Sequence, residues 1–218
     1  MELIQSLIDF ILHIDVHLAE ITSQYGTLTY LILFAIIFCE TGFIVTPFLP
    51  GDSLLFAAGA ISALDGSGLN VHLMVVLLII AAFAGNLVNY SVGRYIGPKV
   101  FEQEYRFIKR EYLDRTKKFF DKFGSMTIVY TRFAPILRTF APFIAGVGQM
   151  HYGRFMLFNF IGGFLWVVIF SYAGYFFGNV PFVKENFESV VIGIILVSLI
   201  PSVYIFLKAK FGKKEELN

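Results

Sequence analysis

Two apolar segments of this chain, 39–59 and 130–146, are interrupted by prolines and still carry charges. The first segment holds two acidic residues and the second holds two arginines. These four residues are Glu40, Asp52, Arg132 and Arg138. A charge at the centre of a bilayer costs about 2.5–3.5 kcal/mol on insertion scales, so ionisable residues there usually face a cavity and mark a binding or transport path. The opposite signs predict that the segments meet and handle a small anionic group inside a membrane.

The composition is typical of a polytopic membrane protein. Hydrophobic residues make up 57% of the 218 residues and charged residues only 15%, well away from the globular balance. Apolar runs at 71–87 and 190–207 are close to the length that spans a bilayer. We therefore expect a single all-α membrane domain. The net charge of +1 gives no reason to expect a nucleic-acid partner.

Prolines divide the chain around the first charged segment into two helical arms, of which the second is short. We expect one helix over 27–46 that breaks at Pro47, and a second over 54–64 that Asp52 and Ser53 open after a Pro-Gly turn. An arm of about eleven residues rises about 16 Å, roughly half of a bilayer core. These lengths predict a re-entrant hairpin, which enters and leaves the membrane on the same side.

The second charged segment has the same design. Its first arm covers 126–134 and ends at Pro135, and its second arm is opened by Arg138 and Thr139 and covers 140–148. Each arm has about ten residues, again too few to cross a membrane. We therefore predict a second re-entrant hairpin.

The second arm of each hairpin would point its N-terminal end into the membrane interior. Such ends carry about half a positive charge and free N–H groups, which attract phosphate or carboxylate. Arginine adds a fork of donors that matches phosphate oxygens. The predicted phosphate-binding residues are Arg132, Arg138, Ser53 and Thr139. Alternatively, the arginines only hold the hairpins together through ion pairs with the acids, although buried pairs often stabilise no more than apolar replacements.

The acidic pair, Glu40 and Asp52, has more than one interpretation. Aspartate after a Pro-Gly turn commonly caps a helix, and this role for Asp52 is compatible with a functional one. A carboxylate that exchanges an arginine partner for a proton would couple transport to a proton gradient, and Glu40 is the first candidate. Further residues are expected to support the cavity: Asn86, Tyr90, Pro50, Gly51, Pro135, Pro142 and Asn159.

Each hairpin is followed by a long apolar stretch that is expected to span the membrane, at 70–97 and 151–178. The two stretches end alike, with YSVGRYIG at 90–97 and SYAGYFFG at 171–178, and their glycines permit close helix approach. A hairpin plus a spanning helix is therefore an internal repeat that is used twice. Because one spanning helix separates the hairpins, the repeat must be inverted, as in many secondary transporters.

The predicted organisation has five parts within one domain. They are an interfacial helix at 1–24, repeat one at 25–97, a basic linker at 98–122, repeat two at 123–178 and a C-terminal transmembrane helix at 188–208. Nine Lys and Arg residues lie between 94 and 122, whereas residues 1–93 hold none. The positive-inside rule therefore places the linker and the C-terminus in the cytoplasm. The side of the N-terminus stays open.

No metal or other cofactor is expected. His13 and His17 lie one helical turn apart, but no third ligand accompanies them at a clear spacing. Cys39 is the only cysteine, so the chain forms no internal disulfide, and we interpret the residue as a small apolar filler.

Three sequence patterns together resemble the bacterial DedA family of inner-membrane proteins, which belongs to the VTT superfamily. They are ETG-x4-PF-LPGDSLL at 40–55, Y-x2-GR-x2-G at 90–97 and RF-x-P-x2-RTF-x-P-x2-AG at 132–146. The resemblance implies two opposed re-entrant hairpins in the bacterial cytoplasmic membrane. The acidic and arginine pairs that the family requires fall here on Glu40 and Asp52, and on Arg132 and Arg138. The family often has aspartate where this chain has Asn86, which argues against a proton role for that position.

The resemblance further implies a flippase that returns undecaprenyl phosphate across the cytoplasmic membrane, coupled to the proton gradient. The expected partners are a polyprenyl phosphate or phospholipid substrate, membrane lipids and protons, and a homo-oligomer stays open. Other functions left open are a proton-coupled ion or small-molecule antiporter that maintains membrane potential, a general phospholipid scramblase, a lipid phosphatase and a non-transporting assembly protein. We expect no enzyme, because the histidines lie outside the charged hairpins and the sequence pairs no nucleophile with a base.

Overall fold

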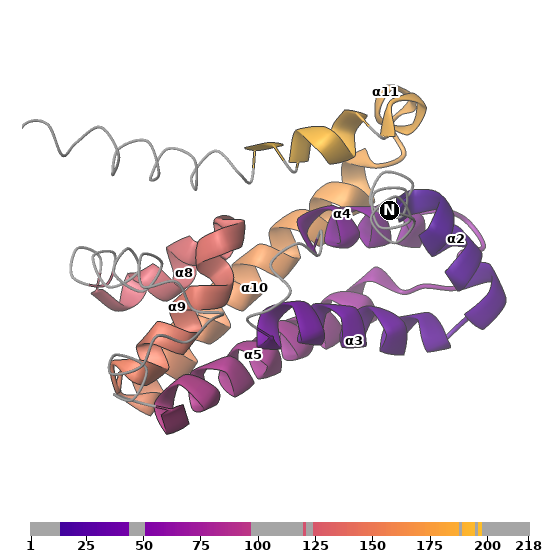
Figure 1. The fold of residues 1–218 in the computed structure, drawn as a ribbon. Helices are drawn as coiled ribbons and strands as arrows, with labels where there is room; N and C mark the ends of the chain where they lie inside the picture. The colour runs from indigo at the N-terminus through magenta and orange to yellow at the C-terminus, as the bar shows by residue number, and fades with distance from the viewer. Residues whose placement is uncertain are drawn as a thin grey trace, which may run out of the picture.

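The computed structural model describes residues 14–43, 51–96, 120, 124–187, 189–194 and 196–197, and all regular structure in these residues is helical (Figure 1). The first half of the chain contains α2 (Ile14–Tyr25), α3 (Leu28–Gly42), α4 (Gly51–Ser62) and α5 (Val71–Ile96). The second half contains the short 3-10 helices η1 (Gly124–Met126) and η2 (Thr131–Phe133), and the α-helices α8 (Thr127–Tyr130), α9 (Pro135–Val147), α10 (Tyr152–Phe177) and α11 (Pro181–Glu185).

Of the helices in the described ranges, α5 and α10 are long and apolar enough to cross a bilayer. Each has 26 residues, and their most apolar windows have mean hydropathies of 2.4 and 1.9. At about 1.5 Å per residue each helix extends about 39 Å, against a hydrocarbon core of about 30 Å. The predicted long apolar helices at 70–97 and 151–178 are therefore confirmed.

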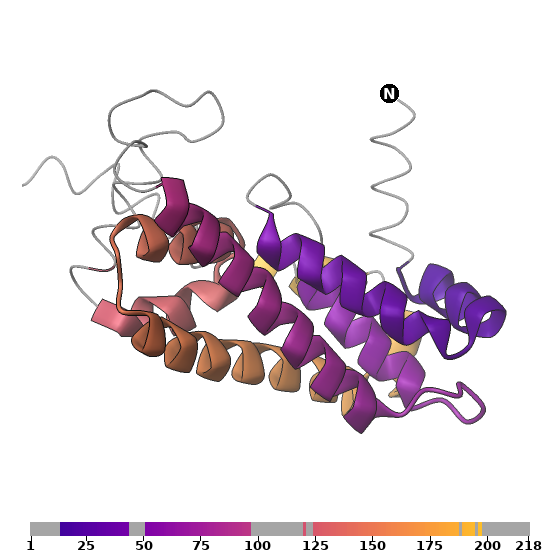
Figure 2. The same cartoon turned by 90° about the horizontal axis from the view of Figure 1, so that it is seen from below.

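The two long helices run in opposite directions (Figure 2). Near the start of α5, Nδ1 of His72 lies 2.6 Å from the hydroxyl of Tyr172, near the end of α10. Near the end of α5, the ring of Tyr90 stacks on Phe155, close to the start of α10, at a centroid distance of 4.1 Å. The centre of the molecule therefore lies between these two contacts.

Each long helix packs tightly against the short helix of the other half. A Cβ at Gly59 of α4 would overlap the backbone of α10, and a Cβ at Gly174 of α10 would overlap the backbone of α4. Gly146 of α9 and Gly93 of α5 make the equivalent contact in the other half of the molecule. The sequence repeat matches Gly93 with Gly174, so it has a structural counterpart in these crossed helix pairs.

The short helices α4 and α9 lead from the centre toward opposite ends of the molecule. α4 runs toward the end of α10, where the carbonyl of Ala60 accepts a hydrogen bond from Nδ2 of Asn179 at 2.8 Å. α9 runs toward the end of α5, where Gly146 meets the backbone of Tyr90 and Arg94. Because α5 and α10 are antiparallel, these two ends lie on opposite sides.

The first hairpin is broken earlier than predicted. α3 ends at Gly42 rather than at Thr46, and the residue that follows is extended, with φ −106° and ψ 127°. Gly42 lies against the backbone of Gly85 in α5, a close contact that sequence periodicity does not reveal. α4 covers 51–62 rather than 54–64. Two prolines that were expected at the break lie outside the described residues: Pro47 and Pro50.

The second hairpin differs more from the prediction. Its first arm is not one helix over 126–134 but a succession of three short turns, η1, α8 and η2. α9 begins at Pro135 rather than at Thr139, because proline fits the first helical position, where no hydrogen-bond donor is needed. Arg138 therefore lies inside the helix, with its N–H bonded to the carbonyl of Ala134 at 2.8 Å.

Parts of three other predictions concern residues outside the described ranges. These are the beginning of the interfacial helix at 1–24, of which α2 covers the later part, most of the linker at 98–122 and most of the C-terminal helix at 188–208.

Candidate functional site

Arg138 joins the two hairpins through ion pairs with both acidic residues. Its Nη1 donates to Oδ1 of Asp52 at 2.8 Å, and its Nη2 donates to Oε1 of Glu40. All three residues are buried, with 3%, 6% and 0% of their surfaces exposed for Arg138, Asp52 and Glu40. The guanidinium thus lies between the end of α3 and the start of α4, as the complementary charges of the segments suggest.

The helix ends explain why these groups meet. Glu40 lies two residues before the end of α3, Asp52 is the second residue of α4, and Arg138 lies in the first turns of α9. A Cβ at Gly51, the first residue of α4, would overlap the carboxylate of Glu40. Only glycine therefore allows the carboxylate to lie against the N-terminus of α4, where the helix dipole favours a negative charge.

Trp166 of α10 completes this cluster, although the sequence analysis did not assign it to the site. Its Nε1 donates to Oδ1 of Asp52 at 2.7 Å. Cζ of Arg138 lies 4.9 Å from the centroid of the indole ring and Cζ of Arg132 lies 6.0 Å from it, within the range of cation–π attraction. The signal available in the sequence was that Trp166 is the only tryptophan of the chain, and in the structure it is fully buried.

Arg132 has a different environment from Arg138. Its Nη2 donates to Oδ1 of Asn159 at 2.6 Å and to the carbonyl of Ala82 at 3.2 Å. Among the described residues no carboxylate lies within ion-pair distance of Arg132, and its buried Nη1 has no hydrogen-bond partner. The structure therefore separates the two arginines, since one is neutralised by carboxylates and the other is held by neutral groups.

Asn86 and Asn159 support Arg132 from the two long helices. The amide of Asn86 contacts both residues, and in the orientation that satisfies its atoms its oxygen accepts from Nη2 of Arg132 at 2.8 Å. Its nitrogen then donates to the carbonyl of Thr41 at 3.3 Å. Nδ2 of Asn159 donates to the carbonyl of Phe83 at 3.0 Å. These amides place the guanidinium at the crossing of α5 and α10.

Asn89 is a further buried residue that the sequence analysis missed. Its Nδ2 donates to the carbonyl of Thr139 at 2.8 Å and approaches the carbonyl of Thr41 at 3.5 Å. Its Oδ1 has no hydrogen-bond partner among the described residues. Asn89 therefore ties α5 to both hairpins beside the ion pairs.

The other predicted site residues divide into two groups. Ser53 and Thr139 are buried near the starts of α4 and α9, close to Asp52 and Arg138 in the chain. Tyr90 does not lie with the charges, because its hydroxyl donates to the carbonyl of Met150 and accepts from Nη1 of Arg94 at 2.9 Å. The hydroxyl of Tyr90 therefore contacts other groups than the charged residues, and its predicted support of the central cavity stays a prediction.

The predicted prolines do not share one position. Pro135 opens α9, and Pro142 lies within that helix rather than at a break. Pro50 lies outside the described residues, and so does His13, which precedes His17 by one helical turn in the sequence. Nδ1 of His17 lies 3.8 Å from Oε2 of Glu20. In the described part of the chain no group of three His, Cys, Asp or Glu residues could hold a metal ion.

With both carboxylates ionised and both arginines protonated, the four charged groups sum to zero but are distributed unevenly. Arg138 and its two carboxylate partners then carry a net charge of −1, and Arg132 beside them carries +1. Burying an unpaired cation is costly unless polar groups or a counter-ion compensate it. Three amide and carbonyl oxygens, and at longer range the charge of Glu40, compensate Arg132 in part. Its Nη1 is left without a hydrogen-bond partner among the described residues.

Comparison with known proteins gives a consistent set of relatives. The VTT domain family model matches residues 49–176. The chain is 55% identical over 211 residues to Protein DedA of Escherichia coli K12, which covers 96% of both chains. It is 42% identical over 168 residues to an uncharacterized membrane protein of Mycobacterium tuberculosis, which covers 77% of this chain and 74% of that protein.

A more distant relative is the inner membrane protein YqjA of Escherichia coli K12, 34% identical over 182 residues, or 83% of this chain and 81% of YqjA. No solved structure matches the chain.

Proposed function

Because this chain belongs to the VTT domain family of membrane proteins, we propose that it carries a lipid phosphate across the bacterial cytoplasmic membrane, with undecaprenyl phosphate as the substrate. The observation that carries this proposal is Arg132, a buried guanidinium with no carboxylate partner among the described residues. Arginine offers a phosphate two parallel donors, and a site that excludes water strengthens the attraction.

The position of Arg132 supports translocation rather than surface binding. The residue contacts the middle of α5, at Ala82 and Asn86, and the two long helices cross there. The short helices have 12 and 13 residues and extend about 18–20 Å, too little to cross a bilayer. We propose that α4 and α9 are the inner arms of re-entrant hairpins that enter from opposite faces.

The ion-pair cluster supplies a route for proton coupling. Glu40 gives up favourable interactions if Arg138 turns toward an incoming phosphate, and a proton on Glu40 would then neutralise the buried carboxylate. Phosphate binding and protonation would therefore favour each other, which is the linkage that a proton-driven carrier needs. We propose this exchange for Glu40, with Asp52 held in place by Trp166.

Orientation follows from the described end of α5. Arg94 lies at this end, directly before the basic linker of the sequence. The positive-inside rule places this end of the molecule in the cytoplasm. The opposite end, where α4 and α10 finish, would then face the periplasm.

A transport assay tests the proposal. Purified protein is placed in vesicles with labelled undecaprenyl phosphate, and the arrival of label in the opposite leaflet is followed with and without a pH gradient. We expect transport that the gradient accelerates. Arg132→Gln should abolish transport and Glu40→Gln should abolish its response to the gradient. Arg154→Gln, which changes an exposed arginine of α10, is the matched control and should behave as the unaltered protein.

Two outcomes would contradict the proposal. One is equal transport of undecaprenol, which lacks the phosphate, and the other is full activity of Arg132→Gln. The closed Arg138 cluster also suits a proton-coupled antiporter that does not move lipid. Gradient-driven exchange of small ions in vesicles without lipid phosphate would identify that function, and movement of ordinary phospholipids without any gradient would identify a scramblase.

A further inference from the structure

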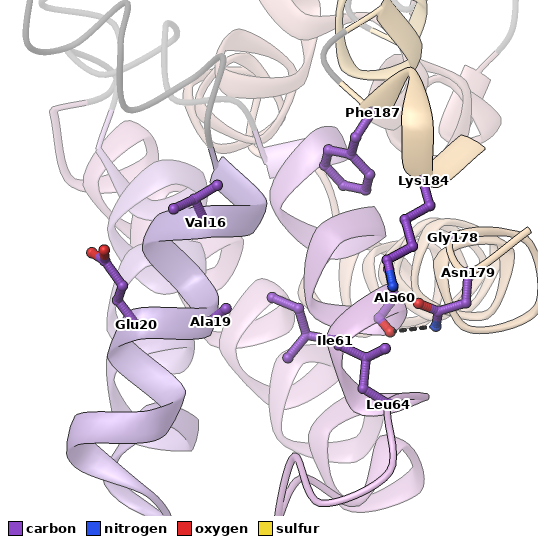
Figure 3. Close-up of a pocket in the computed structure, with 10 residues that line it drawn as sticks. All are labelled: Val16, Ala19, Glu20, Ala60, Ile61, Leu64, Gly178, Asn179, Lys184 and Phe187. Atoms are coloured by element: carbon purple, nitrogen blue, oxygen red, sulfur yellow. Dashed lines mark hydrogen bonds between the residues drawn. The ribbon is translucent and has the colours of Figure 1, made fainter. Parts of the chain in front are cut away.

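A separate pocket lies at the far end of α4 from the charged residues (Figure 3). Its volume is about 340 Å³, within the range of small-molecule sites. Residues of α2, α4 and α11 and residues directly after α4, α10 and α11 line this open pocket. Ala60 on its wall follows Asp52 by eight residues of helix, about 12 Å along the axis. The pocket is therefore distinct from the central site.

Most of the pocket wall is apolar, and one side of it is polar. The apolar side is formed by Val16, Ala19, Ile61, Leu64 and Phe187. On the polar side, the side chain of Lys184 extends toward the carbonyl of Ala60 and the amide of Asn179 (Figure 3). Nδ2 of Asn179 already donates to that carbonyl, so the amide oxygen remains as an acceptor. The pocket thus offers a cation, an acceptor and an apolar surface.

The charge of Lys184 is not neutralised within the described part of the chain. None of the carboxylates described there forms an ion pair with it. Glu20 also borders the pocket, but its carboxylate points away from Lys184 (Figure 3) and lies 3.8 Å from His17. An anionic ligand would therefore meet an available ammonium group.

The surroundings of the pocket indicate where such a ligand comes from. The pocket includes Gly178 and Asn179, directly after the end of α10, at the depth where a helix of this length leaves the hydrocarbon core. Phe176 and Phe177, the last two residues of α10, are 66% and 61% exposed, and Phe182 of α11 is 72% exposed. Exposed aromatic residues at a helix end are typical of the zone of lipid headgroups. A free phosphate would leave the apolar wall uncovered, whereas a lipid would cover it.

We propose that this pocket binds one anionic glycerophospholipid from the surrounding membrane. Its phosphate pairs with Lys184, a headgroup hydroxyl donates to Oδ1 of Asn179, and part of an acyl chain lies along Ile61, Leu64 and Phe187. The site does not depend on the transport function, because it is separate from Arg132 and the ion pairs. The lipid would join α2 and α11 to the end of the α4–α10 pair.

Native mass spectrometry of the purified full-length protein tests this proposal. Phosphatidylglycerol and phosphatidylcholine with identical acyl chains are added in equal amounts. The mass of each protein–lipid complex then shows which lipid is bound, and the amounts of the two complexes are compared. We expect one retained phosphatidylglycerol, preferred by about fivefold, the effect of one lysine near a membrane surface. Lys184→Gln should remove the preference and Lys184→Arg should retain it. Arg154→Gln makes the same charge change at the other end of the molecule and should leave the preference unaltered.

Cross-linking then locates the lipid. A phosphatidylglycerol with a photoreactive group in its acyl chain should label peptides that contain Ile61, Leu64 or Phe187, and excess phosphatidylglycerol should prevent the labelling. An unchanged preference in Lys184→Gln would overturn the proposal. Labelling confined to other helices would overturn it too, as would a pocket that takes up no lipid because another segment of the chain or a second copy fills it.

Discussion

Nη1 of Arg138 lies 2.8 Å from Oδ1 of Asp52, although the two residues are separated by 86 positions in the chain. This contact joins the beginnings of two short helices that lead to opposite ends of the molecule. The contact therefore holds the starts of α4 and α9 together at the centre of the molecule. Its loss should affect the whole fold and not only one hairpin.

Arg138→Ala is expected to destabilise the protein by about 3–5 kcal/mol, because it removes the positive charge that forms ion pairs with two buried carboxylates. Reversible unfolding in mixed detergent measures the change. Arg154→Ala, at an exposed position, should cost less than about 0.5 kcal/mol. The triple variant Arg138→Ala, Glu40→Gln and Asp52→Asn should be more stable than Arg138→Ala alone. If it is not, uncompensated charge is not the cause.

Trp166→Phe should destabilise the protein by about 1.5–3 kcal/mol, since it removes a hydrogen bond to a buried carboxylate and keeps most of the ring. Thermal unfolding followed by circular dichroism measures this, because the variant has no tryptophan left to report by fluorescence. If the free energy of unfolding changed by less than about 0.5 kcal/mol, the ion pair with Arg138 alone would be enough to stabilise the buried Asp52.

Asn86→Asp should fold and should be at least as stable as the unaltered protein, because the new carboxylate would face Nη2 of Arg132. It would also neutralise Arg132 and compete with a lipid phosphate. We therefore expect transport by this variant to fall as the pH rises and the carboxylate ionises. Transport rates between pH 5 and pH 8 measure this. A pH profile identical to that of the unaltered protein would contradict the role given to Arg132.

Gly59→Ala and Gly146→Ala should each destabilise the protein by about 1–3 kcal/mol, because the added Cβ overlaps the backbone of the opposite long helix. Gly193→Ala is the control, since a Cβ there meets nothing within 4 Å. This control should be neutral or stabilising, because alanine favours a helix. Similar losses of stability in Gly59→Ala and Gly146→Ala would support the internal repeat. A loss of stability in only one of them would show that the two halves pack differently.

The sequence alone predicts the long helices well and the hairpins poorly. The apolar stretches at 70–97 and 151–178 correspond to α5 and α10 almost to the residue, because a continuous apolar run leaves few alternatives. The ends of the short helices depend instead on backbone contacts between helices, such as Gly42 against Gly85. Such contacts leave no periodic signal in the chain.

The sequence predicts which charged residues form the candidate site but not which partners each arginine contacts. Complementary charges indicated that the hairpins meet, and Arg138 does contact both acids. Nothing in the spacing showed that Arg132 would face Asn86 and Asn159 instead. That division depends on the irregular turns before α9, which place Arg132 against the long helices.

The role of Arg132 as the phosphate-binding residue is tested most directly by equilibrium binding. Trp166 is the only tryptophan and its ring centroid lies 6.0 Å from Cζ of Arg132, so its fluorescence should change when a ligand arrives. Undecaprenyl phosphate is titrated into the unaltered protein, Arg132→Ala and the control Arg154→Ala, and undecaprenol is titrated in parallel. We predict saturable binding of the phosphate form to the unaltered protein and the control, and at least about tenfold weaker binding to Arg132→Ala. Equal binding to Arg132→Ala, or equal binding of undecaprenol, would contradict this account.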